Sequence, residues 1–222
     1  MIKYALFDLD GTLTDPKIGI TTCVQLALNY FGIEVENLDE LQPFIGPPLK
    51  DSFMKFYGLS EEQAVKAMEV YRSRFAVKGL YENNMYNGID KMLRRLRAEG
   101  YQLSVASSKP TIYVEQILEH FDIKKYFHHI VGSFLDGRRV DKEEVVEEAL
   151  RLLGVSEDNK NQAVMIGDRR FDVEGAKSHG ILSVAVSYGY GPKEELNEAN
   201  PDYIVNTVEE LETLLLSLGG LE

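Results

Sequence analysis

From Gly88 onward, segments with helical patterns alternate with short apolar segments of strand length. The strands are expected at Gln102–Ala106, Ile130–Gly132, Ala163–Ile166, Leu182–Val186 and Tyr203–Val205, and the helices at Ile89–Arg97, Thr111–Phe121, Lys142–Leu153, Val173–His179 and Thr207–Leu218. The run Ala163-Val164-Met165-Ile166 is apolar throughout, which is typical of a strand buried on both faces. Helices that link such strands predict a parallel sheet with right-handed crossovers. We therefore expect a three-layer, Rossmann-like α/β core.

Another strand, beginning at Tyr4, precedes this region, and the segment between them shows only helical patterns. Asp15-Pro16 has the signature of an N-cap followed by the first residue of a helix. The remaining helical signals are short segments at Leu38–Phe44 and Pro48–Tyr57 and a capping box, Ser60 to Gln63, that opens a helix to about Lys78. The sequence thus predicts an all-helical cap, residues 16–82, inserted into an α/β core of residues 1–15 and 83–222.

Composition narrows the range of partners. The 222 residues carry a net charge of −12, which argues against nucleic acid or an anionic membrane surface as a partner. No run of about 18 apolar residues is present, so no transmembrane helix is expected. Without a signal-peptide pattern the default expectation is a cytoplasmic monomer or homodimer. An anionic substrate would have to be held by local cations or a metal, against the overall field.

Two acids stand where the first strand ends. If the chain stays extended through Leu9, the side chains of Asp8 and Asp10 point the same way. Two crowded carboxylates require a cation between them or a proton on one of them. The spacing differs from a calcium-binding EF-hand loop, because Gly11 is fourth rather than sixth and a strand precedes it. An ordinary turn remains the alternative for this motif taken alone.

Other polar groups follow the later strands. Ser107-Ser108-Lys109 ends one strand, and Gly167-Asp168, with Asp172 shortly after, ends another. Lys142 begins the helix that leads into the latter strand. In open α/β sheets the ligand lies beyond the carboxyl ends of the strands. Acids, a hydroxyl and a lysine at one edge are suited to phosphoryl transfer with a hard divalent cation.

These motifs resemble those of the haloacid dehalogenase superfamily, in particular its phosphoglycolate-phosphatase-like branch, which has a helical cap after the first motif. The four motifs occur in the family's order: Asp8-Leu9-Asp10-Gly11-Thr12, Ser107, Lys142, and Gly167-Asp168 with Asp172. The resemblance implies that Asp8 is a nucleophile that forms an aspartyl-phosphate. It implies that Asp10 is the general acid and base, with its backbone carbonyl on the metal.

The resemblance also implies Mg²⁺ as the cofactor, with Asp8 and Asp168 as carboxylate ligands. Asp172 would bind the ion through water or hold the site together. The substrate phosphate is expected beside Ser107, with Ser108, Lys109, Gly11 and Thr12 as further contacts. Lys142 would bridge the nucleophile and the transferring phosphoryl group. The predicted function is a magnesium-dependent phosphatase of small phosphorylated metabolites, such as phosphoglycolate or a nucleoside monophosphate.

Several alternatives stay open from the sequence. Lys142, with Asp141 and Glu144 as a capping box, lies in a first helical turn where the dipole disfavours a cation, and Glu143 or Glu144 could compensate it locally. Asp172 could be a helix N-cap. Lys109 could be solvated, and Arg169 and Arg170 could lie either near the mouth of the site or on the surface. A phosphomutase of the β-phosphoglucomutase type and a non-catalytic, receiver-like module are the competing functions.

Overall fold

A computed structural model describes residues 1–220 of the chain, which folds into two compact units. The core unit comprises Met1–Thr14 and the chain from Met85 onward, and the helical unit comprises Asp15–Asn84. A two-stranded sheet of β2 (Thr14–Asp15) and β3 (Asn84–Met85) forms where the chain passes from one unit to the other. None of the described helices is long and apolar enough to cross a membrane.

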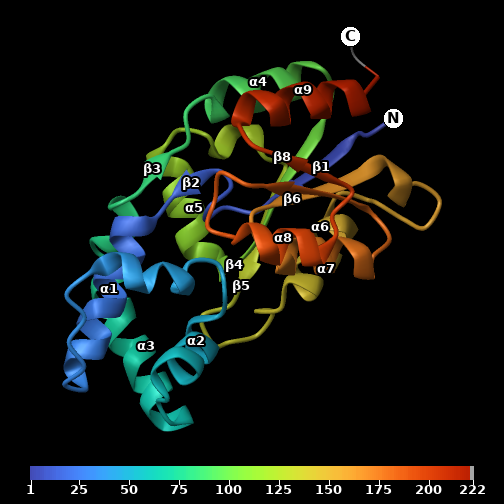
Figure 1. The fold of residues 1–222 in the computed structure, drawn as a ribbon. Coiled ribbons are helices and arrows are strands. Elements are labelled where there is room, and N and C mark those ends of the chain that lie inside the picture. The colour runs from blue at the N-terminus through green and yellow to red at the C-terminus, as the bar shows by residue number, and fades with distance from the viewer. Residues whose placement is uncertain (221–222) are drawn as a thin grey trace. The chain divides into compact units, whose positions relative to one another are not determined.

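The core unit is built on a six-stranded sheet with the order β5-β4-β1-β6-β7-β8 (Figure 1). The strands are β1 (Tyr4–Phe7), β4 (Gln102–Pro110), β5 (His129–Ser133), β6 (Ala163–Gly167), β7 (Leu182–Val186) and β8 (Tyr203–Val205). Every pairing is parallel, and Phe7 of β1 lies opposite Val105 of β4 and Ile166 of β6. The first motif therefore leaves the centre of the sheet, between the strands that carry the second and fourth motifs.

Helices cover both faces of this sheet. They are α4 (Ile89–Ala98), α5 (Thr111–His120), α6 (Lys142–Leu152), α7 (Arg170–Ser178), α8 (Lys193–Ala199) and α9 (Val208–Leu218), with short 3-10 turns η3 (Lys124–Tyr126) and η4 (Lys160–Gln162). In Figure 1, α4 and α9 lie side by side above the sheet, and α6 and α7 pack together below it. Buried side chains of β1, β4 and α6, including Leu6, Ala106 and Val146, share one apolar cluster. The predicted three-layer α/β fold is confirmed.

Some boundaries differ from the prediction. β4 runs four residues beyond Ala106, because Pro110 still pairs with Ser133 of β5 across a register shift. The helix predicted from Val173 begins at Arg170, and α8 stands in a region expected to be a loop. Only one residue of α8, Leu196, is buried, so its amphipathic signal in the sequence is weak.

The helical unit contains α1 (Lys17–Tyr30), η1 (Leu38–Phe44), α2 (Leu49–Tyr57), α3 (Glu61–Phe75) and η2 (Gly79–Tyr81). The predicted capping box of α3 is present, because the side chains of Ser60 and Gln63 bond each other's backbone N–H groups. The predicted start of α1 is wrong by one residue. Pro16 occupies the N-cap position, and Asp15 instead accepts a hydrogen bond from the Lys17 backbone N–H at 3.1 Å.

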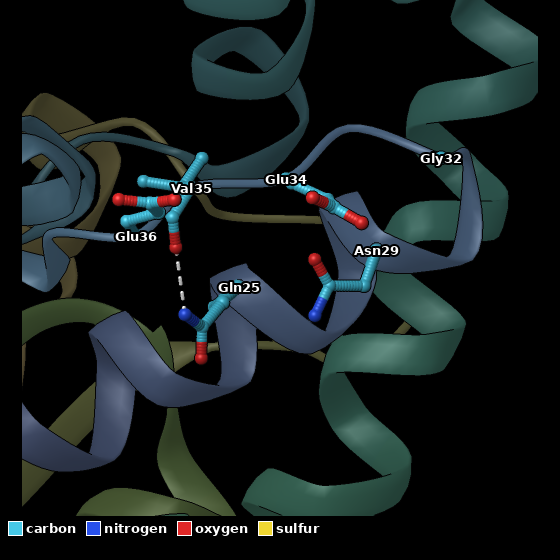
Figure 2. Close-up of a pocket in the computed structure, with 6 residues that line it drawn as sticks. All are labelled: Gln25, Asn29, Gly32, Glu34, Val35 and Glu36. Carbon is cyan, nitrogen blue, oxygen red and sulfur yellow. Dashed lines mark hydrogen bonds between the residues drawn. The ribbon is translucent and has the colours of Figure 1, made fainter.

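A pocket of about 320 Å³ lies in the helical unit between α1 and the loop that follows it (Figure 2). Its wall is held by a 2.8 Å hydrogen bond from the Gln25 side-chain amide to the Val35 carbonyl. The other lining residues are Asn29, Gly32, Glu34 and Glu36, so the charged groups of the lining are acidic. This charge is unsuited to a phosphate ester, and the pocket contains none of the predicted site residues.

Candidate active site

The first of the four motifs lies where β1 ends. The Asp8 backbone N–H still bonds Ile166 of β6, at 2.9 Å, so the strand geometry extends to this residue. The Leu9 carbonyl then accepts hydrogen bonds from the backbone N–H groups of Leu13 and Thr14, which closes a tight turn. Gly11 sits in this turn at φ +81°, where a side chain would be strained. The turn leaves Asp8 and Asp10 almost wholly buried.

Lys142 reaches two carboxylates from the first turn of α6. Its Nζ lies 3.0 Å from Asp8 Oδ1, 2.8 Å from Asp172 Oδ1 and 3.1 Å from the Ala106 carbonyl oxygen. Burial alone would lower the pKa of Lys142, but Asp172 and Asp8 more than offset this, so its pKa lies above the usual 10.5. The ammonium group is therefore charged, and it joins the end of β1 to the first turn of α7.

The local alternatives for Lys142 are wrong. The predicted capping box is also wrong, since Asp141 occupies the N-cap position of α6 without a side-chain hydrogen bond to it. Glu143 and Glu144 remain in the first turn, where they complement the helix dipole. Lys142 has turned away from both toward the buried acids, which supply the anionic compensation that its position in the helix requires.

Asp168 and Asp172 complete an acidic cluster with Asp8. Each of the three offers a carboxylate oxygen within 4.8 Å of the others, and all three side chains are buried. Asp172 is the third residue of α7 rather than its N-cap, so the N-cap alternative is wrong. Its Oδ2 accepts a 3.0 Å hydrogen bond from the Arg169 backbone N–H, which fixes the residue in the first turn of the helix.

Three observations fit this cluster to a divalent cation. Its ligand atoms are all carboxylate oxygens, the donors that Mg²⁺ and Ca²⁺ prefer. Within residues 1–220, buried Asp168 Oδ1 has no hydrogen-bond partner. Burial, with the charges of Asp172 and Asp8, raises the pKa of Asp168 well above 3.8. Burial also raises the pKa of Asp172, to about 6. A cation between these oxygens would reverse both shifts.

The end of β4 brings a second lysine to Asp10. Lys109 Nζ lies 2.7 Å from Asp10 Oδ2, and the exposed fractions of the two side chains are 7% and 9%. Lys109 is thus not a solvated surface residue. Ser107 is buried beside it, and its hydroxyl accepts a long hydrogen bond, 3.4 Å, from the Lys109 backbone N–H. Ser108 is only partly buried.

The comparisons with known proteins agree with this arrangement. Residues 5–186 match the family described as haloacid dehalogenase-like hydrolase. The chain belongs to this family. The match runs from the second residue of β1 to the end of β7 and includes every predicted site residue, so the resemblance drawn from the four motifs is confirmed.

Relatives of this haloacid dehalogenase-like hydrolase carry several names. A protein named 5'-nucleotidase from Pseudomonas aeruginosa is 43% identical, over 96% of this chain and 95% of its own length. One named tyrosine-protein kinase PtkA from Mycobacterium tuberculosis is 36% identical, over 96% of this chain and 72% of its own length. A phosphoglycolate phosphatase from Vibrio parahaemolyticus is 27% identical, over 95% and 94%. The crystal structure of a predicted phosphatase from Clostridium acetobutylicum is 48% identical, with a TM-score of 0.93 over 98% of this chain and 99% of that one.

The structure of this hydrolase adds a segment that the sequence analysis did not use. Tyr188–Gly191 follows β7 and packs against the fourth motif. The Tyr190 backbone N–H donates a 2.7 Å hydrogen bond to Asp168 Oδ2, and the Tyr188 hydroxyl donates one of 3.0 Å to the Thr12 carbonyl. A Cβ on Gly189 would lie 2.3 Å from Asp168 Cβ, so the close approach requires glycine. Its place at the carboxyl end of a strand was the signal that could have found it.

Arg169 is a second residue whose role sequence reasoning missed. Its guanidinium makes a bidentate pair with Glu195 of α8, through Nε at 2.8 Å and Nη2 at 3.0 Å. The Arg170 backbone N–H bonds the same carboxylate at 3.0 Å. The surface location considered for Arg169 is wrong, because the residue is buried. The pair anchors the short link from Asp168 to the start of α7. Glu195 lies in α8, the helix that was not predicted.

Proposed function

We propose that this hydrolase is a magnesium-dependent phosphatase of small phosphomonoesters, with 5'-nucleoside monophosphates as the first class to test. The observation that carries the proposal is the pairing of each predicted reacting carboxylate with its own buried lysine. Asp8 pairs with Lys142, and Asp10 pairs with Lys109. Lys142 also contacts Asp172 of the cluster suited to a cation, which supports a single site for the proposed nucleophile, acid and metal ligands.

In the first step the Asp8 carboxylate attacks phosphorus, and the bond from phosphorus to the ester oxygen breaks. Asp10 gives its proton to the departing oxygen, so the alcohol leaves neutral and Asp10 becomes a carboxylate. Burial favours the protonated form needed here, since it raises the pKa of Asp10 above 3.8 although Lys109 opposes the shift. Asp8 then carries the phosphoryl group as an acyl phosphate.

In the second step Asp10 takes a proton from water as the water oxygen attacks phosphorus, which releases inorganic phosphate and restores both aspartates. Lys142 stays beside the phosphoryl oxygens and stabilises the charge that develops on them. Asp8 and Asp168, with Asp172 and the Asp10 carbonyl, would hold Mg²⁺, which supplies charge neutralisation and orients the phosphate when bound.

The relatives guide the choice of substrate. The 43% identical protein named 5'-nucleotidase favours nucleotides, and the more distant one named phosphoglycolate phosphatase favours a small acid phosphate. Because one relative is named tyrosine-protein kinase, tyrosine is also tested as an acceptor of the phosphoryl group. The net charge of −12 weighs against polyanionic substrates.

The test is Asp8→Asn, with Asp158→Asn as the control, because Asp158 is exposed and outside the site. Phosphate release is measured over 5'-nucleotides, phosphoglycolate and sugar phosphates, alongside isomerised sugar phosphate and phosphotyrosine formation. We expect the wild type and the control to release phosphate, and Asp8→Asn to be folded but inactive. Wild-type turnover in purified Asp8→Asn would overturn the nucleophile assignment. Isomerised sugar without phosphate release would instead favour the mutase.

A further inference from the structure

The backbone around Lys109 is set by the residue that follows it. Pro110 disfavours the helical region for the preceding residue, so Lys109 is held extended. β4 accordingly continues through Lys109, although its pairing with β5 shifts register between Ala106 and Pro110. The Lys109 backbone N–H donates a 3.4 Å hydrogen bond to the Ser107 hydroxyl. The backbone that carries the Lys109 side chain is thus part of the strand rather than of a loop.

The Lys109 side chain ends on one carboxylate oxygen. Nζ lies 2.7 Å from Asp10 Oδ2, with the ammonium group and the carboxylate both nearly buried. A buried ammonium group is costly unless it is paired, so this position is suited to a permanent partner rather than to a transient ligand. The other oxygen, Asp10 Oδ1, is buried and has no hydrogen-bond partner among residues 1–220.

The two lysines of the site divide the carboxylates between them. Lys142 lies on Asp8 and Asp172, and Lys109 lies on Asp10. We propose that Lys109 is a positioning residue for Asp10: it holds Oδ2 and leaves Oδ1 to exchange the proton with the leaving-group oxygen. This inference rests on the proposed function. The inference replaces the predicted role of Lys109 in substrate binding. Lys109 would instead act in the first step, in which the alcohol departs.

The role predicts a dependence on the leaving group. p-Nitrophenolate leaves readily as an anion and needs little help from an acid, whereas an alkoxide needs the proton. A residue that positions the acid should therefore matter for alkyl esters and little for p-nitrophenyl phosphate. A lysine that binds the phosphate would matter equally for both, because the two esters share that group.

The experiment compares kcat/KM for p-nitrophenyl phosphate and for the best alkyl ester of the panel. The variants are Asp10→Asn, Lys109→Met, the double variant, and Lys124→Met as a control, because Lys124 is partly exposed and lies outside the site. For Lys109→Met we expect a loss of about 10-fold or more on the alkyl ester, from the lower part of the range for general acid catalysis, and under about 3-fold on the nitrophenyl ester. In the Asp10→Asn background, Lys109→Met should change neither value.

Two results would overturn the inference. Equal losses of Lys109→Met on both esters would assign Lys109 to phosphate binding or to general stability. A further loss in the Asp10→Asn background would show that it does not act through Asp10. If Lys109→Met alone does not fold, the comparison of Asp10→Asn with the double variant decides. Both of these variants lack the Asp10 carboxylate, the charge that Lys109→Met alone would leave buried without a partner. An Asp10→Asn variant without leaving-group selectivity would instead refute the acid assignment itself.

Discussion

Replacing Lys142 by methionine removes the cation that two buried carboxylates share. The side chain keeps nearly the same length, so the change is mainly one of charge. Nζ contacts Asp8 Oδ1 at 3.0 Å and Asp172 Oδ1 at 2.8 Å, and all three side chains are at most 6% exposed. Without it, the metal-free protein must hold these carboxylates uncompensated or bind protons to neutralise them.

The size of the effect follows from that burial. Removing one partner of a buried ion pair costs about 3–5 kcal/mol, because the remaining charge is left in a poorly solvated place. For a chain of this size, about 1 kcal/mol corresponds to a shift of about 2–4 °C, so the melting temperature should fall by about 6–20 °C. Mg²⁺ should recover part of the loss, since it supplies positive charge to the same oxygens.

The assay is thermal unfolding in EDTA and in Mg²⁺, with Lys124→Met as the control. Lys124 pairs with Glu119 at 2.7 Å on the surface, where an ion pair contributes about 0–1 kcal/mol. In the same samples, kcat of Lys142→Met at saturating Mg²⁺ should fall sharply. A stability loss in EDTA no larger than that of the control would refute the electrostatic account of Lys142. An unchanged kcat would refute its place in the chemistry.

Two further predictions concern the acidic cluster. Gly189→Ala should displace Asp168 and raise the Mg²⁺ concentration needed for half-maximal activity and for half-maximal thermal stabilisation by about 10- to 100-fold. An unchanged Mg²⁺ requirement would show that the Tyr188–Gly191 segment does not shape the site. The folded pKa of Asp172, about 6, lies above the ordinary 3.8, so the metal-free native state binds more protons between about pH 4 and 6 and loses stability as pH rises through that window. Stabilisation by Mg²⁺ in thermal unfolding should therefore grow from pH 5 to pH 7, and a constant increment would contradict the shift.

The parts of the fold that the sequence predicted are those set by local pattern. The apolar run Ala163–Ile166 and the alternation of helices and strands suffice for a parallel sheet, since few topologies are compatible with them. The edge of the sheet at which the motifs meet could also be predicted, because ligands of parallel sheets lie beyond the carboxyl ends of the strands. An anionic partner for Lys142 could be predicted from its place in the first turn of a helix. Each of these features can be read from a short stretch of sequence, and few arrangements in space are compatible with it.

What could not be predicted depends on contacts between distant segments. β4 was expected to end at Ala106 because Ser107, Ser108 and Lys109 look like loop residues, yet pairing of Pro110 with Ser133 keeps them extended. The approach of Gly189 to Asp168 joins residues that no local pattern relates. The capping box at Asp141 was a local rule, and it failed here although the equivalent pattern at Ser60 held.

The placement of the two lysines explains why four buried carboxylates can share one sheet edge. Asp8, Asp10, Asp168 and Asp172 carry up to four negative charges, and Lys109 and Lys142 balance two of them. When Asp10 is ionised, the excess of two charges matches one divalent cation. Without the ion, burial raises the pKa values of Asp168 and Asp172, which favours proton binding in its place. Because the lysines serve different acids, their removal should separate experimentally: Lys142→Met in stability and metal dependence, Lys109→Met in leaving-group dependence. A common phenotype for both would mean that the site titrates and reacts as one electrostatic unit, without the division of roles that the contacts indicate.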